Sequence, residues 1–166
     1  SGKAVGRAVH DLFEYEVARR SRSEGPDPLS DVLDVLITEH EAREHRAVAE
    51  RMLATFLDSG LWTALQDAEI VHTELPVAGL DDGECPTVID GTMDLLYRLR
   101  GTWHLVDYKT EPVPASERST ILQKYEDQLN TYAALWERAT GQTIAETSLW
   151  LADASAKVTV SGDDGA

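Results

Sequence analysis

Hydrophobic residues in the first part of the chain recur at the spacing of amphipathic helices. The first apolar stripe consists of Val5, Val9, Leu12, Phe13 and Val17. Its period near 3.6 predicts a short helix over residues 3–20, and the polar Ser-, Gly- and Pro-containing stretch 21–28 predicts a loop. A second stripe predicts a long helix that is capped by Asp31, ends near Gly60 and has a kink in its polar middle, residues 39–46.

From residue 69 the pattern changes to the alternation and β-branched content that are typical of strands. Three strands are predicted, at residues 69–77, 87–99 and 102–110. Arg100-Gly101 predicts a tight hairpin between the second and third strands. The Asp-Asp-Gly sequence at 81–83 predicts the turn between the first two. The three strands therefore form a meander.

Helical spacing then returns, followed by further strand-like segments. The stripe of this last helix consists of Leu122, Tyr125, Leu129, Tyr132 and Trp136. Ser119 is the expected N-cap and Gly141 the expected end, and strands are predicted at 147–151 and 157–160. Neither a repeat nor a linker divides the sequence, so we predict one domain over 1–166, of the α/β or α+β class, with a mixed central sheet flanked by helices.

Composition is that of a globular protein. The 166 residues are 42% hydrophobic and 27% charged. An apolar run of roughly 18 residues, which a membrane span needs, does not occur, and the first residues lack the apolar core of a secretory signal. We therefore expect a cytoplasmic protein without membrane contact. Cys85 is the one cysteine, which excludes an intrachain disulfide and an iron–sulfur cluster.

Charge is unevenly distributed along the chain. Fifteen basic and 30 acidic residues give a net charge of −15, the wrong sign for a protein held on nucleic acid by broad electrostatics. Residues 67–97 contain eight acidic residues and no Lys or Arg, whereas 98–124 contain five basic and three acidic residues. A soluble acidic surface explains most of the carboxylates. It does not explain the junction between the two segments.

Three residues near this junction can form a hydrolytic centre. Asp107 and Lys109 are two apart on a strand and so share a face, and the hairpin brings Asp94 onto the neighbouring strand. Two carboxylates can hold Mg²⁺ or Mn²⁺, and a lysine can orient water or stabilise charge, which suits phosphodiester hydrolysis. The alternative is an exposed ion pair. Asp94 favours the functional interpretation because its neighbours are apolar, whereas Asp90 is interpreted as a turn or strand-entry residue.

Five short blocks occur in one order along the chain. They are Gly6-x-x-x-His10-x-x-x-Glu14, Glu74-Leu75-Pro76-Val77, Gly91-Thr92-Met93-Asp94, Asp107-Tyr108-Lys109-Thr110 and Gln128-x-x-x-Tyr132. In this order they resemble the blocks of RecB-like nucleases of the PD-(D/E)xK superfamily, over about residues 4–152. The resemblance implies a restriction-endonuclease-like core. It is greatest to the nuclease domain at the C-terminal end of AddA- or RecB-type (UvrD-like) helicase–nucleases.

The resemblance also implies roles for individual residues. Asp94 and Asp107 match the metal-binding carboxylates, and Lys109 matches the catalytic lysine. His10 matches a histidine ligand on the first helix, and the backbone carbonyl of Tyr108 matches a further ligand. A neutral imidazole beside carboxylates suits Mn²⁺ or Mg²⁺, although it is softer than Mg²⁺ prefers.

The remaining candidates each have a structural alternative. Gln128 and Tyr132 share one side of a helix and suit gripping a phosphate or steadying the lysine and the attacking water, but Tyr132 also fits the apolar stripe. Glu74 on the first strand is a candidate for completing the metal site or positioning Lys109, or else an edge-strand acid. His10 can instead be a surface residue paired with Glu14, one turn along the helix.

Together these observations predict a metal-dependent DNA nuclease. The family implies a single-stranded DNA exonuclease that acts at broken ends in recombinational repair, coupled to superfamily 1 helicase domains in cis or in trans. The chain lacks a Walker A sequence and hence an ATP site, so we expect a domain excised from the C-terminal end of a larger helicase–nuclease. The alternatives are a catalytically silent DNA-end or protein-docking module with the nuclease fold, and a nuclease that acts on RNA.

Overall fold

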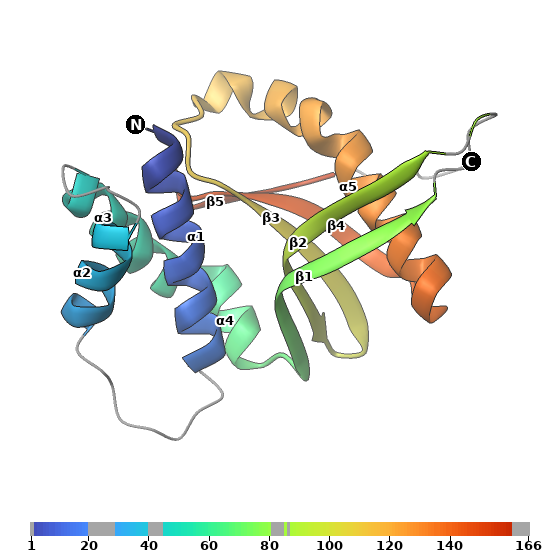
Figure 1. Ribbon diagram of the computed structural model, residues 1–166, viewed down its shortest axis with the longest axis horizontal. Coiled ribbons are helices and arrows are strands. Elements are labelled where there is room, and N and C mark those ends of the chain that lie inside the picture. Colours follow the sequence, from blue (N-terminus) through green and yellow to red (C-terminus); the bar gives the residue numbers. More distant parts are fainter. Residues whose placement is uncertain (1, 20–28, 40–44, 81–84, 86, 161–166) are drawn as a thin grey trace. The chain divides into compact units, whose positions relative to one another are not determined.

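The computed structural model describes residues 2–19, 29–39, 45–80, 85 and 87–160. In chain order the elements are α1 (Gly2–Arg19), α2 (Leu29–Glu39), α3 (Arg46–Leu57), α4 (Gly60–Gln66), β1 (Ile70–Leu80), β2 (Val88–Leu99), β3 (Thr102–Lys109), the 3-10 turn η2 (Ala115–Glu117), α5 (Arg118–Thr140), β4 (Ile144–Leu151) and β5 (Ala156–Thr159) (Figure 1). Over these ranges, a helix long and apolar enough to cross a membrane does not occur.

The strands form one mixed sheet in the order β1-β2-β3-β4-β5 (Figure 1). Strands β1 and β2 pair antiparallel, as do β2 and β3. Between β3 and β4 the Ser148 hydroxyl donates to the Leu105 carbonyl, and the Ala152 N–H donates to the Lys109 carbonyl. Both bonds join residues with the same sequence offset, as parallel strands require. Helix α5 is the crossover between them, and the predicted α/β architecture with a mixed sheet is confirmed.

The long helix predicted after residue 31 is two helices. Helix α2 begins at Leu29, so Asp31 lies inside it and not at its cap, and α3 begins at Arg46. A further helix, α4, follows Ser59, whose hydroxyl accepts the Trp62 N–H at 3.1 Å. The sequence predicts one element because the polar residues 39–46 are interpreted as a kink and not as an end. The predicted loop 21–28, the turn 81–83 and the tail lie outside the described residues.

Helix α5 begins before its predicted cap. Turn η2 leads directly into the helix at Arg118, Glu117 occupies the N-cap position without a side-chain cap, and Ser119 lies in the first turn. The predicted C-terminal end is confirmed: Gly141 has a φ of 70° and its N–H bonds the Glu137 carbonyl, as a left-handed cap requires.

The chain forms two compact units, and the first contains the four N-terminal helices. Its residues are Ser1–Asp67, Tyr108–Val113 and Trp150–Lys157. Its core is aromatic: the Phe13 and Phe56 rings stack at 4.3 Å, and Tyr108 meets Phe13 edge-on at 5.1 Å. Trp150 meets Phe56 in the same way. The ends of β3 and β4 are thus packed within this unit by large apolar rings.

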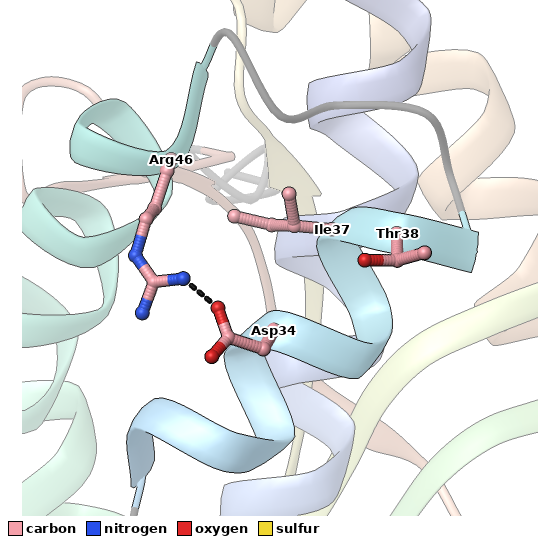
Figure 2. Close-up of a pocket in the computed structure, with 4 residues that line it drawn as sticks. All are labelled: Asp34, Ile37, Thr38 and Arg46. Atoms are coloured by element: carbon pink, nitrogen blue, oxygen red, sulfur yellow. Dashed lines mark hydrogen bonds and ion pairs between the residues drawn. The ribbon is translucent and has the colours of Figure 1, made fainter.

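A pocket of the first unit lies between α2 and the start of α3. Its lining residues are Asp34, Ile37, Thr38 and Arg46. Figure 2 shows the Arg46 guanidinium directed at the Asp34 carboxylate, with which it forms an ion pair. The lining contains none of the residues that the sequence singled out for chemistry.

The second unit contains most of the sheet together with α5. Its residues are Ala68–Asp107, Pro114–Leu149 and Val158–Ala166. Arg138 of α5 contacts the hairpin of β1 and β2: its guanidinium donates to the Leu80 carbonyl at 2.8 Å. Close to it on α5, Trp136 meets Trp103 of β3 at 5.1 Å between ring centroids. The strands that carry the candidate carboxylates are therefore held by α5.

Candidate metal centre

The hairpin of β2 and β3 positions two of the candidate carboxylates. Its register pairs Leu95 with Val106, and Asp94 and Asp107 are the next residue on each strand. Extending that register by one residue sets them opposite each other, where side chains share a face. The turn Arg100-Gly101 fixes the register, since φ angles of 51° and 79° suit the two-residue turn that such hairpins favour.

Glu74 on β1 brings a further carboxylate beside Asp94. The pairs Thr73–Leu95 and Leu75–Met93 on either side of it set Glu74 opposite Asp94. A carboxylate oxygen of Glu74 lies within 4.8 Å of one of Asp94. Three neighbouring strands of the second unit thus each contribute one acid.

The chemistry of this donor set fits a hard divalent cation. Metal–oxygen distances of about 2.0–2.6 Å allow two ligand oxygens of one ion to lie roughly 3–5 Å apart, which agrees with the Glu74–Asp94 separation. Asp107 is only 8% exposed, and a buried carboxylate is costly unless a partner or cation compensates it. Carboxylate oxygens select Mg²⁺ or Mn²⁺ over softer metals.

His10, Tyr108 and Lys109 belong to the first unit. The His10 ring meets the Tyr108 ring edge-on at 5.5 Å. Tyr108 is 2% exposed, and the Lys109 carbonyl accepts the Ala152 N–H at 2.8 Å. These contacts fix the backbone directly after Asp107. The roles of His10 and of the Tyr108 carbonyl as ligands, and of Lys109 in catalysis, stay predictions.

The Gln128–Tyr132 pair lies against β2. Gln128 Nε2 donates to the Tyr132 hydroxyl oxygen at 3.0 Å. A Cβ at Gly91 would lie 2.1 Å from that oxygen, so only glycine permits this approach. Tyr132 is also buried beside Leu129 on the apolar side of α5. It therefore belongs to the apolar stripe and also presents a hydroxyl that Gln128 orients. Gly91, which the hydroxyl contacts, precedes Asp94 by three residues, or about 10 Å along β2.

The histidines of the sheet have other neighbours. His72 stacks on Trp103 at 6.0 Å, and His104 stacks on Tyr97 at 4.8 Å, with its Nδ1 3.4 Å from Glu146. Burial, and secondly the charge of Glu146, raise the pKa of Tyr97 to about 12. Both histidines therefore have structural surroundings.

Two features of the site were not expected from the sequence. One is the contact of Gly91 with Tyr132, for which a glycine inside a strand is the available signal, since it marks a bulge or a close approach. The other is the left-handed backbone of Glu74, which has a φ of 46°. The residue type at this position does not indicate it.

Comparison with known proteins connects the chain with one family. The model of the PD-(D/E)XK nuclease superfamily matches residues 1–161. The match spans both units and all the candidate residues.

Individual relatives carry a common description. The chain is 27% identical over 164 residues to an ATP-dependent helicase/nuclease subunit of Alkaliphilus metalliredigens, in a match that covers 89% of this chain and 13% of the relative. Proteins of the same description from Alkaliphilus oremlandii (29% over 129 residues, 71% of this chain) and Staphylococcus epidermidis (31% over 119 residues, 64% of this chain) match over 10% of their own length. The chain thus spans about a tenth of the length of these relatives.

Proposed function

The chain belongs to the PD-(D/E)XK nuclease superfamily, and on that premise we propose that it hydrolyses phosphodiester bonds of DNA with Mg²⁺ or Mn²⁺ as cofactor. The observation that supports this most is the position of three acids, Glu74, Asp94 and Asp107, on neighbouring strands, with Glu74 and Asp94 within 4.8 Å. Carboxylate oxygens are the ligands that Mg²⁺ and Mn²⁺ prefer.

The carboxylates and the lysine have separate tasks in this proposal. Asp94 and Asp107 hold the cation, which supplies Lewis-acid polarisation of the phosphate when bound. Lys109 donates a hydrogen bond to the attacking water or to the phosphate oxygen that gains charge. On the sequence resemblance, His10 and the carbonyl of Tyr108 are further ligands.

Gln128 and Tyr132 contact the substrate in this proposal. Because the Gln128 amide donates to the Tyr132 oxygen, the hydroxyl orientation is restricted and its proton can be directed at a phosphate oxygen. At about 10 Å along β2 from Asp94, that phosphate is a neighbour of the one being cleaved. In this proposal the pair binds the strand, and steadying Lys109 and the attacking water is its alternative task.

The relatives suggest a larger setting. They are helicase/nuclease subunits, of which this chain spans 13% or 10%. We propose that the chain is the nuclease domain of such a protein. It then cuts single-stranded DNA that superfamily 1 helicase domains supply in cis or in trans, at broken ends in recombinational repair. ATP hydrolysis belongs to those domains.

The proposal is tested by cleavage of an end-labelled single-stranded oligonucleotide with Mg²⁺ or Mn²⁺, with and without chelator. Low ionic strength and high protein concentration are needed for weak complexes, because cationic contacts to phosphate weaken with salt and the net charge of −15 opposes binding. We expect Lys109→Ala and Asp107→Asn to lower the rate by at least a hundredfold. Lys3→Ala, at an exposed lysine of α1, is the matched control. Equal cleavage by Lys109→Ala and the parent, or cleavage that survives chelation, contradicts the proposal.

The net charge favours one alternative of another class. With eight acids and no bases in residues 67–97, the chain could be a catalytically silent docking module that keeps the nuclease fold. Calorimetry separates the two: a nuclease binds Mn²⁺ and loses that binding in Asp94→Asn, whereas a silent module shows no such difference. RNA and DNA oligonucleotides of one sequence, compared side by side, decide the substrate.

A further inference from the structure

Gly6 of α1 lies directly against Thr110, the residue that follows β3. A Cβ built on Gly6 would lie 3.0 Å from the Thr110 hydroxyl oxygen, whereas non-bonded heavy atoms are most favourably about 3.5–4.0 Å apart. Inside a helix, glycine costs stability relative to alanine. The approach of Thr110 is the feature of the structure that favours glycine at this position.

The contact belongs to one face of α1. Gly6, His10 and Phe13 are four and three residues apart, so they lie on the same side of the helix. The Tyr108 ring meets His10 at 5.5 Å and Phe13 at 5.1 Å between ring centroids, in both cases edge-on. This face of α1 therefore lies along residues 108–110, and all these residues belong to the first unit.

Lys109 lies between the two contacts. In an extended segment, residues two apart share a side and the residue between them points to the other. Tyr108 and Thr110 contact α1, which leaves Lys109 on the opposite side. The Lys109 carbonyl also accepts the Ala152 N–H at 2.8 Å. The backbone that carries the lysine is thus held between α1 and the end of β4, and a side chain at residue 6 would push against it.

We propose that Gly6 and Thr110 are positioning residues for Lys109: the missing side chain at residue 6 lets α1 pack against Thr110, and this contact sets where the lysine ammonium lies. The inference rests on the proposed function, in which Lys109 acts on the attacking water or the phosphate. The competing explanation is that the contact serves packing alone. In that case a side chain at residue 6 changes stability and leaves the rate constant of the folded protein unchanged.

A small set of variants separates the two explanations. Gly6→Ala places a methyl group against the Thr110 hydroxyl. It is combined with Thr110→Ala, which removes the opposing oxygen, and with Thr110→Val, which keeps a group of similar size there. Gly60→Ala is the matched control, because Gly60 is also helical and in the first unit, and a Cβ there meets nothing within 4 Å. Each protein is melted, and its cleavage of a single strand in saturating Mn²⁺ is resolved into kcat and KM.

We expect Gly6→Ala to lower kcat roughly three- to tenfold at unchanged KM, since a misplacement of about 1 Å can cost a hundredfold and this one is a fraction of that. Its Tm should stay within about 3 °C of the parent's, because the gain in helix propensity opposes the crowding. In the Thr110→Ala background, Gly6→Ala should lower kcat by less than about twofold, whereas in the Thr110→Val background the full loss returns. Gly60→Ala should keep the parent's kcat.

Several results would overturn the inference. If Gly6→Ala keeps the parent's kcat, or fails to fold, the contact is one of packing. An equal loss of kcat in the Thr110→Ala background would mean that Gly6 acts through another neighbour. These results leave the proposed function standing. A parent protein that does not cleave the strand contradicts the proposed function, and the inference falls with it.

Discussion

The contact between Gly91 and Tyr132 ties two sequence blocks together at the scale of single residues. Tyr132 lies on α5 and Gly91 on β2, and the hydroxyl occupies the space that a side chain at residue 91 would fill. Gln128 orients the same hydroxyl. The spacing of glycine and Asp94 along β2 thereby sets the distance from the hydroxyl to the carboxylates.

Gly91→Ala is expected to displace Tyr132. Its Cβ would lie 2.1 Å from the hydroxyl oxygen and 2.6 Å from the ring carbon that bears it, so the ring must move or β2 must shift. Overpacking of this kind costs about 1–3 kcal/mol of unfolding free energy, which urea denaturation measures. Gly60→Ala is the control, because a Cβ there meets nothing within 4 Å. Equal stability of the two alanine variants would refute the contact.

Tyr97 gives the folded protein a pH dependence on the alkaline side. Its pKa is raised to about 12 by burial and by Glu146, so the unfolded chain loses this proton near pH 10 and the folded chain only near pH 12. The folded form therefore binds more protons between these values, and stability that is present below pH 10 is lost as the pH rises to 12. The loss is about 3 kcal/mol. Urea denaturation at pH 9, 10.5 and 12 should show it, and Tyr97→Phe should abolish it.

The position of a single residue can be predicted from the sequence when residues close to it in the chain determine that position. The neighbouring positions of Asp94 and Asp107 follow from counting across a short hairpin whose turn, Arg100-Gly101, is readable in the sequence. The left-handed backbone conformation of Glu74 cannot be predicted in this way. Glutamate has no preference for positive φ, and the conformation arises from the pairing around it.

At the scale of secondary-structure elements, hydrophobic periodicity predicts an element correctly where its pattern is long and regular. Strands β1, β2 and β3 and helix α5 were predicted within a few residues, since their patterns are long and regular. Helices α2 and α3 are predicted as one helix because the polar residues 39–46 are interpreted as a kink. Helix α4 was missed because its start depends on a single hydroxyl, that of Ser59. Seven residues are too few for a periodic signal.

Two serines allow a test: Ser59 caps a helix in the structure, whereas Ser119 is a cap only in the prediction from sequence. Ser59 is 9% exposed, accepts the Trp62 N–H and donates to the Phe56 carbonyl, so Ser59→Ala should cost about 1–2 kcal/mol. Ser119, which the sequence favoured as a cap, is exposed and lies inside α5, so Ser119→Ala should change stability by less than about 0.5 kcal/mol. Urea denaturation of both variants compares them directly. A larger loss for Ser119→Ala would restore the prediction made from the sequence.

At the scale of the whole molecule, the division into two units falls inside the most specific motif. Asp107 belongs to the second unit and Tyr108 to the first, because Asp107 follows the register of β2 while the Tyr108 ring packs on Phe13 and Phe56. The sequence shows a continuous strand here and does not mark the boundary. Charge distribution, by contrast, can be counted from the sequence.

That distribution limits how strongly salt can affect DNA binding. The basic segment 98–124 contains five Lys or Arg, and one of them, Arg98, lies 3.4 Å from Glu69. Each phosphate contact contributes about −0.7 to the slope of log affinity against log salt for single strands, so five contacts give at most about −3.5. The net charge of −15 makes the slope shallower still.

Fluorescence anisotropy of a labelled single strand, in chelator to prevent cleavage, measures this slope between 20 and 200 mM salt. Over roughly this range the Debye length falls below 10 Å. Arg118→Ala should reduce the slope by about 0.7. A slope near −6 would mean that DNA contacts basic residues outside this segment as well.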